Sequence, residues 1–244
     1  MGDSAGGSVV GENGRAMSDT TAPLAAALWD FDGTLADTEP IWIEGEFELV
    51  GQLGGRWSVE HAHQLVGNSL LDSGAYILNT IGRPDLTPEW VVNWLISYVV
   101  DRVTDGPMPW RPGAYELLTA LRAADVPCAL VSASYRILLD AALARLPQGT
   151  FSVSVAGDEV TRGKPHPEPY ERACHALDVD ARHCVVFEDS EMGARAGNAA
   201  GALVVAIPNK VPVPAAPRRV HVASLADLDV DAVRRLLENA DALA

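Results

Sequence analysis

The chain has 244 residues, of which 48% are apolar, and its formal net charge is −15 with only two lysines, Lys164 and Lys210. Because it has no row of cations to neutralise phosphates, we expect neither nucleic acid nor an anionic membrane as a partner. No uninterrupted apolar run approaches twenty residues, so the sequence also predicts no membrane-spanning helix.

Two features bear on the location of the protein. The three cysteines, Cys128, Cys174 and Cys184, form no Cys-x-x-Cys pair and leave one over, which argues against a disulfide framework. Residues 1–22 are rich in Gly and Ser and lack the apolar segment of a secretory signal, so we expect a disordered extension there. A reducing, cytoplasmic location fits both features.

The first part of the chain predicts one strand and then only helices. The apolar run 24–29 is typical of a buried strand. From 37 to 108 the sequence shows no alternation typical of strands. It shows amphipathic stretches between Gly- and Pro-containing breaks, at 41–53, 58–66, 70–81 and 87–103. This pattern predicts an all-helical block.

From residue 109 onward, strand and helix patterns alternate. The predicted strands are 127–132, 151–155, 183–187 and 202–207, and the predicted helices are 112–124, 134–146, 167–177, 192–200 and 230–238. Such alternation predicts an α/β fold with a parallel sheet and right-handed crossovers. The strand at 24–29 therefore belongs with 109–244, and the helical block is an insertion.

Two carboxylates stand just past the first predicted strand. Asp30 and Asp32 are followed by Gly33, which permits a turn, and by Thr34, whose hydroxyl can fix the loop or a carboxylate. Open α/β sheets bind ligands outside the carboxyl ends of their strands, so both acids are candidates for catalysis. An ordinary Asp-Gly turn is the alternative for this short stretch taken alone.

Serine and lysine residues stand near the ends of later strands. Ser132, with the backbone N–H groups of Ala133 and Ser134, suits phosphate oxygens, although Ser134 alone is typical of a helix N-cap. Lys164 precedes Pro165 in a chain almost without lysine, which favours a positioned point charge. The alternative is a solvated loop lysine.

Glu188 and Asp189 close the strand predicted at 183–187. Together with Asp30 and Asp32 they would place four carboxyl groups at one edge of the sheet, which is unfavourable unless a cation neutralises them. A small cage of oxygen ligands suits Mg²⁺. The alternative is an acid that interacts with the dipole of the following helix.

These residues resemble the four motifs of the haloacid dehalogenase-like superfamily in order and rough spacing. The matching residues are Asp30, Phe31, Asp32, Gly33 and Thr34, then Ser132, then Lys164 and Pro165, and finally Phe187, Glu188, Asp189 and Ser190. The helical block is similar to the α-helical cap of the branch containing beta-phosphoglucomutase and phosphoglycolate phosphatase. The resemblance implies a Rossmann-like core of residues 23–36 and 109–244 with a cap at 37–108.

The resemblance also implies a phosphatase that uses Mg²⁺ and hydrolyses a small phosphate monoester through an aspartyl-phosphate. Asp30 would be the nucleophile and Asp32 the general acid and base. Mg²⁺ would be bound by Asp30, Asp189 and the Asp32 backbone carbonyl, and by Glu188 directly or through water. Ser132, the Ala133 N–H and Lys164 would hold the phosphoryl oxygens. Thr34 and a cap loop are further substrate-binding candidates; the loop residues are Gly67, Asn68 and Ser69.

Two alternative functions remain open: a sugar-phosphate mutase similar to beta-phosphoglucomutase, and a non-catalytic binding protein with the same fold. The mutase is disfavoured because Trp42 and Leu70 stand where the mutase pattern has a histidine and an arginine. These two residues favour a substrate with an uncharged or partly apolar body. A non-catalytic protein would be expected to have lost at least one of four motif residues, and this chain has kept them all. They are Asp30, Asp32, Lys164 and Asp189.

Overall fold

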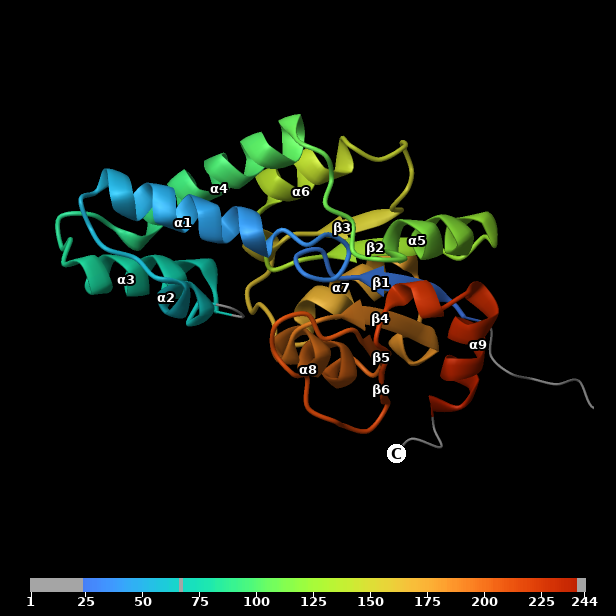
Figure 1. Ribbon diagram of the computed structural model, residues 1–244. Helices are drawn as coiled ribbons and strands as arrows, with labels where there is room; N and C mark the ends of the chain where they lie inside the picture. Colours follow the sequence, from blue (N-terminus) through green and yellow to red (C-terminus); the bar gives the residue numbers. More distant parts are fainter. Residues whose placement is uncertain (1–23, 66–67, 241–244) are drawn as a thin grey trace, which may run out of the picture.

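The computed structural model describes residues 24–65 and 68–240. The predicted N-terminal extension and the candidate residue Gly67 lie outside the described residues. The described elements form a sheet with helices on both faces and, to one side of it, a separate group of helices (Figure 1).

The sheet is parallel throughout and has the strand order β3-β2-β1-β4-β5-β6. The strands are β1 (Ala26–Trp29), β2 (Cys128–Val131), β3 (Val153–Val155), β4 (Cys184–Glu188), β5 (Leu203–Ala206) and β6 (Arg219–His221). The predicted α/β core is confirmed, and β1 pairs with the later strands as expected. β6 was not predicted, because an edge strand of three residues with Arg and His at its ends has no apolar run.

Helices cover both faces of the sheet. One face carries α5 (Ala114–Ala123), α6 (Arg136–Leu143) and α9 (Val230–Glu238), and the other carries α7 (Glu168–Leu177) and α8 (Glu191–Ala199). Neighbouring residues of one strand point to opposite faces, so Trp29 packs on Phe187 in the first layer while Leu28 lies in the second. Strands buried on both faces explain the continuous apolar runs of the sequence.

Four helices occupy the segment predicted as the cap: α1 (Glu39–Gln52), α2 (Val59–His63), α3 (Leu70–Ile81) and α4 (Pro88–Asp105). Hydroxyl groups of Ser58, Ser69 and Thr87 cap the last three at their N-termini. The helices bury an apolar cluster of their own, which includes Leu49 and Ile77. The boundaries of the cap as a separate domain remain a prediction.

The two chain segments that join these helices to the sheet run side by side. The Asp37 N–H donates to the Pro109 carbonyl at 2.8 Å, and the Arg111 N–H donates to the Leu35 carbonyl at 3.0 Å. The Asn209 side chain donates to Asp37 and accepts from Arg111. The start of α1 is therefore held beside the end of β1, where the first motif lies.

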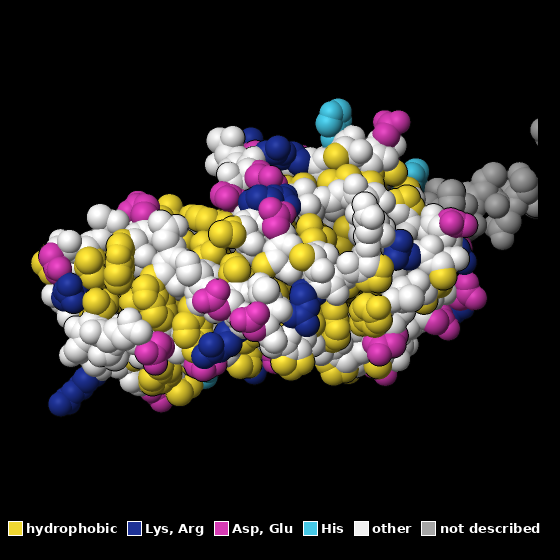
Figure 2. Space-filling view, turned by 90° about the horizontal axis from the view of Figure 1, so that it is seen from above, with side chains coloured by type: hydrophobic (Ala, Val, Ile, Leu, Met, Phe, Trp, Pro, Cys, Tyr) yellow, Lys and Arg dark blue, Asp and Glu magenta, His cyan; other side chains and the backbone are white. Residues whose placement is uncertain are grey.

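No helix in the described part of the chain is long and apolar enough to cross a membrane. On the face shown in Figure 2, Arg and Lys side chains are scattered among Asp and Glu and form no continuous basic band.

The crossing of α3 and α4 gives a test of cap packing. A Cβ on Gly74 would lie 2.7 Å from the Pro88 carbonyl oxygen, whereas a Cβ on Gly51 would meet nothing within 4 Å. We expect Gly74→Ala to lower the free energy of unfolding by about 1–3 kcal/mol through overpacking. Gly51→Ala is the matched control and should leave stability unchanged or raise it by up to about 1 kcal/mol. Denaturant unfolding measures both, and equal stability of the two variants would contradict the packing argument.

Candidate active site

Asp30 lies directly after β1, the strand between β2 and β4. Its side chain is buried, and its Oδ1 accepts a hydrogen bond from Lys164 Nζ at 2.7 Å. Its Oδ2 is enclosed and has no hydrogen-bond partner among the described residues. Burial and the nearby Glu188 raise the pKa of Asp30 to about 7, although Lys164 opposes the shift. One oxygen of this carboxyl group is thus held in place while the other is left for a ligand.

The Lys164 ammonium binds at the carboxyl ends of three strands, β1, β2 and β4. Besides Asp30, its ammonium donates to Glu188 Oε1 at 2.6 Å and to the Val131 carbonyl at 3.0 Å, and its side chain is only 6% exposed. Burial alone would lower the pKa of Lys164, but the charges of Asp30 and Glu188 outweigh it and raise that pKa well above its usual value. The lysine is therefore a fixed cation, and the alternative of a solvated loop lysine is wrong.

Glu188 is fully buried at the end of β4, and protein donors occupy both of its oxygens. Oε1 accepts from Lys164 and from the Tyr170 hydroxyl at 3.0 Å, while Oε2 accepts from the Ser190 N–H and hydroxyl. A Cβ on Gly193 would lie 1.6 Å from Oε1, so the backbone of α8 approaches this carboxylate as only glycine allows. Glu188 consequently fixes the position of Lys164.

Three carboxyl groups meet at this edge of the sheet. Ligand atoms of Asp30, Glu188 and Asp189 all lie within 4.8 Å of one another. Asp189 accepts from the Thr34 hydroxyl at 3.2 Å, and a Cβ on Gly33 would lie 2.1 Å from its Oδ2. Burial, followed by the charge of Asp30, raises the pKa of Asp189 well above its usual value. Clustered carboxylates, with the enclosed and unpartnered Oδ2 of Asp30 among them, fit a divalent cation.

Asp32 is bound differently from Asp30. Its Oδ1 accepts from the Thr38 hydroxyl at 2.6 Å and the Trp42 indole at 3.2 Å. Its Oδ2 accepts from the hydroxyls of Ser134 at 2.8 Å and Ser132 at 3.2 Å. The side chain of Asp32 is not a member of the carboxylate cluster in the described residues. The two acids of the first motif therefore occupy separate environments, one cationic and one of neutral donors.

Several of these partners were missed from the sequence. Thr38 resembles a helix N-cap but makes no side-chain capping bond, and its hydroxyl binds Asp32 instead. Ser134 was open to the same N-cap interpretation, which is wrong because α6 begins later, with Tyr135 at its N-cap. Tyr170 gave no signal, since only the fold brings its hydroxyl to Glu188.

The remaining candidates are not members of the carboxylate cluster found in the described residues. Ala133 is exposed at the end of β2. In the proposed cap loop, the Asn68 side chain donates to the Gln64 carbonyl, and the Ser69 hydroxyl caps α3 by accepting from the Asp72 N–H. These local bonds explain the conformation of the described loop residues. A role in substrate binding remains a prediction.

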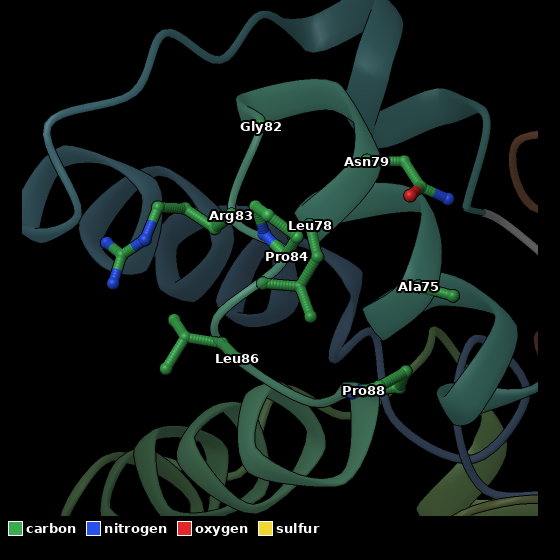
Figure 3. A pocket seen from close by; sticks show the side chains of 8 residues that line it. All are labelled: Ala75, Leu78, Asn79, Gly82, Arg83, Pro84, Leu86 and Pro88. Carbon is green, nitrogen blue, oxygen red and sulfur yellow. The ribbon is translucent and has the colours of Figure 1, made fainter.

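A hollow of about 280 Å³ lies elsewhere in the cap (Figure 3). It is bounded by the C-terminal part of α3, the following loop and the start of α4, and Arg83 at its rim is paired with Asp85. None of its lining residues belongs to the four motifs. The carboxylate cluster, and not this hollow, is therefore the candidate active site.

Comparison with known proteins agrees with this arrangement. The model of the haloacid dehalogenase-like hydrolase family matches residues 24–201. The chain belongs to this family. The match includes the segments that carry all four motif groups, which lie between Asp30 and Ser190.

Individual relatives match most of this chain. The chain is 30% identical over 216 residues to the bifunctional riboflavin kinase/FMN phosphatase of Arabidopsis thaliana, covering 86% of this chain and 54%, about half, of that protein. It is 30% identical to the protein CbbY of Rhodobacter capsulatus, covering 77% of this chain and 86% of CbbY. The crystal structure of CbbY from Rhodobacter sphaeroides in complex with phosphate superposes with a TM-score of 0.78 at 26% identity, covering 85% and 98% of the two chains.

The bond from Tyr170 to Glu188 gives a test of how the lysine is positioned. We expect Tyr170→Phe to lower the free energy of unfolding by about 1–2 kcal/mol, because a buried acceptor loses a donor. Hydrolytic activity should fall several-fold as Glu188 and Lys164 become less fixed. Tyr115→Phe, at an exposed ring, is the matched control. If phosphate release and thermal unfolding change equally little in both variants, Tyr170 has no positioning role.

Proposed function

We propose that this hydrolase is a Mg²⁺-dependent phosphatase that cleaves a small phosphate monoester through an aspartyl-phosphate. The observation that supports it most directly is the Asp30 carboxyl group, fixed by Lys164 at Oδ1 and unpartnered at Oδ2 beside Asp189. A buried carboxylate that keeps one oxygen free is suited to nucleophilic attack and to metal binding. A relative named as a phosphatase supports the same reaction.

Mg²⁺ would be held by Asp30, Asp189 and the backbone carbonyl of Asp32. Glu188 would act through water, because its two oxygens already accept four hydrogen bonds from Lys164, Tyr170 and Ser190. When bound, the cation would offset the negative charge of the carboxylates and of the phosphoryl group.

The residues would divide the reaction into two steps. Asp30 attacks phosphorus, the bond to the leaving oxygen breaks, and Asp32 donates a proton to that oxygen. Asp32 then takes a proton from water, which attacks the aspartyl-phosphate and releases phosphate. Lys164 and the Ser132 hydroxyl stabilise the phosphoryl oxygens, together with the Ala133 N–H. Hydrogen bonds from Thr38, Trp42 and Ser134 hold Asp32 in position for both proton transfers.

The substrate is proposed to have an uncharged or partly apolar body. Trp42, at the start of α1, reaches Asp32 and so stands beside the place where the leaving group must sit. An indole offers apolar surface there and no positive charge for a second phosphate. The position of α1 over the end of β1 would also help to exclude water from the nucleophile.

The nucleophile can be tested by substitution. The wild-type protein is expected to release phosphate from 4-nitrophenyl phosphate with Mg²⁺ and to lose this activity when EDTA removes the metal. Asp30→Asn should lower kcat by at least about 10³-fold, because an amide cannot form the aspartyl-phosphate. Asp101→Asn, at an exposed position of α4, is the control. Substantial turnover by a folded Asp30→Asn protein would exclude the covalent mechanism.

The mutase alternative needs a different assay. A mutase must grip the distal phosphate of a sugar bisphosphate with cationic side chains, and Trp42 supplies none. With beta-glucose 1-phosphate and a bisphosphate primer, we expect release of free phosphate and little glucose 6-phosphate. Efficient isomerisation with little phosphate released would overturn the phosphatase proposal.

A further inference from the structure

The cap contains a buried carboxyl group that the reaction steps above do not use. Glu46 of α1 is 5% exposed, and its Oε2 accepts a hydrogen bond from the Trp57 indole at 3.1 Å. No other donor in the described part of the chain reaches this carboxyl group, and no described cation pairs with it. Its neighbours in the cap core are apolar, Leu49 and Val50 among them.

A carboxyl group in this position is unfavourable for the stability of the cap. Burial raises the pKa of Glu46 to about 7, and the nearby Glu39 adds to the shift, while the Trp57 bond opposes it. An apolar side chain of the same size would avoid the desolvation of a charge. Packing alone therefore gives no reason for an acid here.

Glu46 lies one turn beyond Trp42 on the same face of α1. Glu39, Trp42 and Glu46 are spaced by three and four residues and so share one face of the helix. Trp42 donates to Asp32, and Glu46 follows one turn later, about 6 Å further along the helix axis. Burial raises the pKa of Glu39, and the nearby Lys210 of the core and His63 of α2 oppose this shift. This face therefore looks toward the region between cap and core.

An aromatic wall fixes the carboxyl group in place. The Trp57 ring packs against His61 of α2, with centroids 4.9 Å apart, and against the edge of Tyr76 of α3 at 6.1 Å. With Oε2 bound to Trp57, Oε1 is the oxygen left for a ligand. Rigid aromatic rings beside one free carboxylate oxygen suit a ligand that has carbon faces and hydrogen-bond donors.

We propose that Glu46 and Trp57 form a subsite for the leaving group of the substrate, in which Glu46 accepts a hydrogen bond from a hydroxyl or amine at the end remote from the phosphate. The inference rests on the proposed phosphatase function. It specifies a leaving group that is neutral or cationic and rich in donors, and it disfavours one that ends in a carboxylate or a second phosphate, because like charges would meet.

The kinetic test compares substrates within each variant. For Glu46→Gln, kcat/KM for sorbitol 6-phosphate relative to phenyl phosphate should fall about tenfold, chiefly through KM, since a charge-assisted hydrogen bond is lost. Activity on phosphoglycolate relative to phenyl phosphate should rise. Glu48→Gln, on the exposed side of α1, makes the same charge change and should alter neither ratio. Unchanged ratios in Glu46→Gln would overturn the subsite.

The melting temperature of Glu46→Gln separates a binding role of Glu46 from a purely structural one. The pKa of Glu46 is raised from 4.5 to about 7 on folding, so the ionised group destabilises the native state above pH 7 and has little effect near pH 4.5. Glu39, His61 and Tyr76 are the titratable groups that face this region. Glu46→Gln should therefore melt above the wild-type Tm at pH 8, with the difference shrinking toward pH 5. A lower Tm at both pH values, with equal loss on all substrates, would make Glu46 a packing residue.

A binding measurement separates failure of the subsite from failure of the proposed reaction. In an Asp30→Asn background, calorimetry with sorbitol 6-phosphate should show about tenfold weaker binding when Glu46→Gln is added, while the affinity for inorganic phosphate stays the same. If this difference appears but the wild-type protein releases no phosphate, the reaction is wrong and the subsite stands. If phosphate is released but binding does not depend on Glu46, the subsite is wrong.

Discussion

The contact on which the active site depends is the buried ammonium of Lys164 between Asp30 and Glu188. Three ionised carboxyl groups this close in a buried place would repel one another strongly without a fixed cation, because each raises the cost of ionising the others. Its bond to the Val131 carbonyl extends the contact to the end of β2. The lysine thus joins the carboxyl ends of the three central strands, and the arrangement of the other motif residues follows from it.

The separation of Asp30 from Asp32 is the second consequence of the fold. They stand two residues apart, yet one is bound by a cation and the other by four neutral donors. The donors to Asp32 come from the start of α1 and from the turn after β2. Because Thr38 and Trp42 begin a cap helix, the geometry of the proposed acid and base depends on how the cap docks on the core.

Cap and core also differ in whether their buried carboxyl groups have a cationic partner. In the core, the positive charge of Lys164 offsets the negative charges of Asp30 and Glu188. In the cap, the Trp57 indole is the one partner of Glu46 among the described residues, so ionisation of Glu46 opposes stability. Uncompensated burial of this kind is how binding groups are kept ready for a ligand, at some expense in folding free energy. The family relationship accounts for the core, whereas the proposed subsite lies along α1 and the residues packed on it.

Much of this architecture was determined by the sequence alone. The apolar runs, the helical periodicity and the order of the motif residues predicted the parallel core, five of the described strands and the acids and lysine at one edge of the sheet, because these signals are local in the chain. The tertiary structure decided what depends on distant contacts. Ser134 reaches Asp32 across 102 residues. Tyr170 of α7 reaches Glu188 at the end of β4, and β6 forms against β5. Glu46 is buried because Trp57 packs onto α1. The sequence could not show this, since burial depends on packing and not on spacing along the chain.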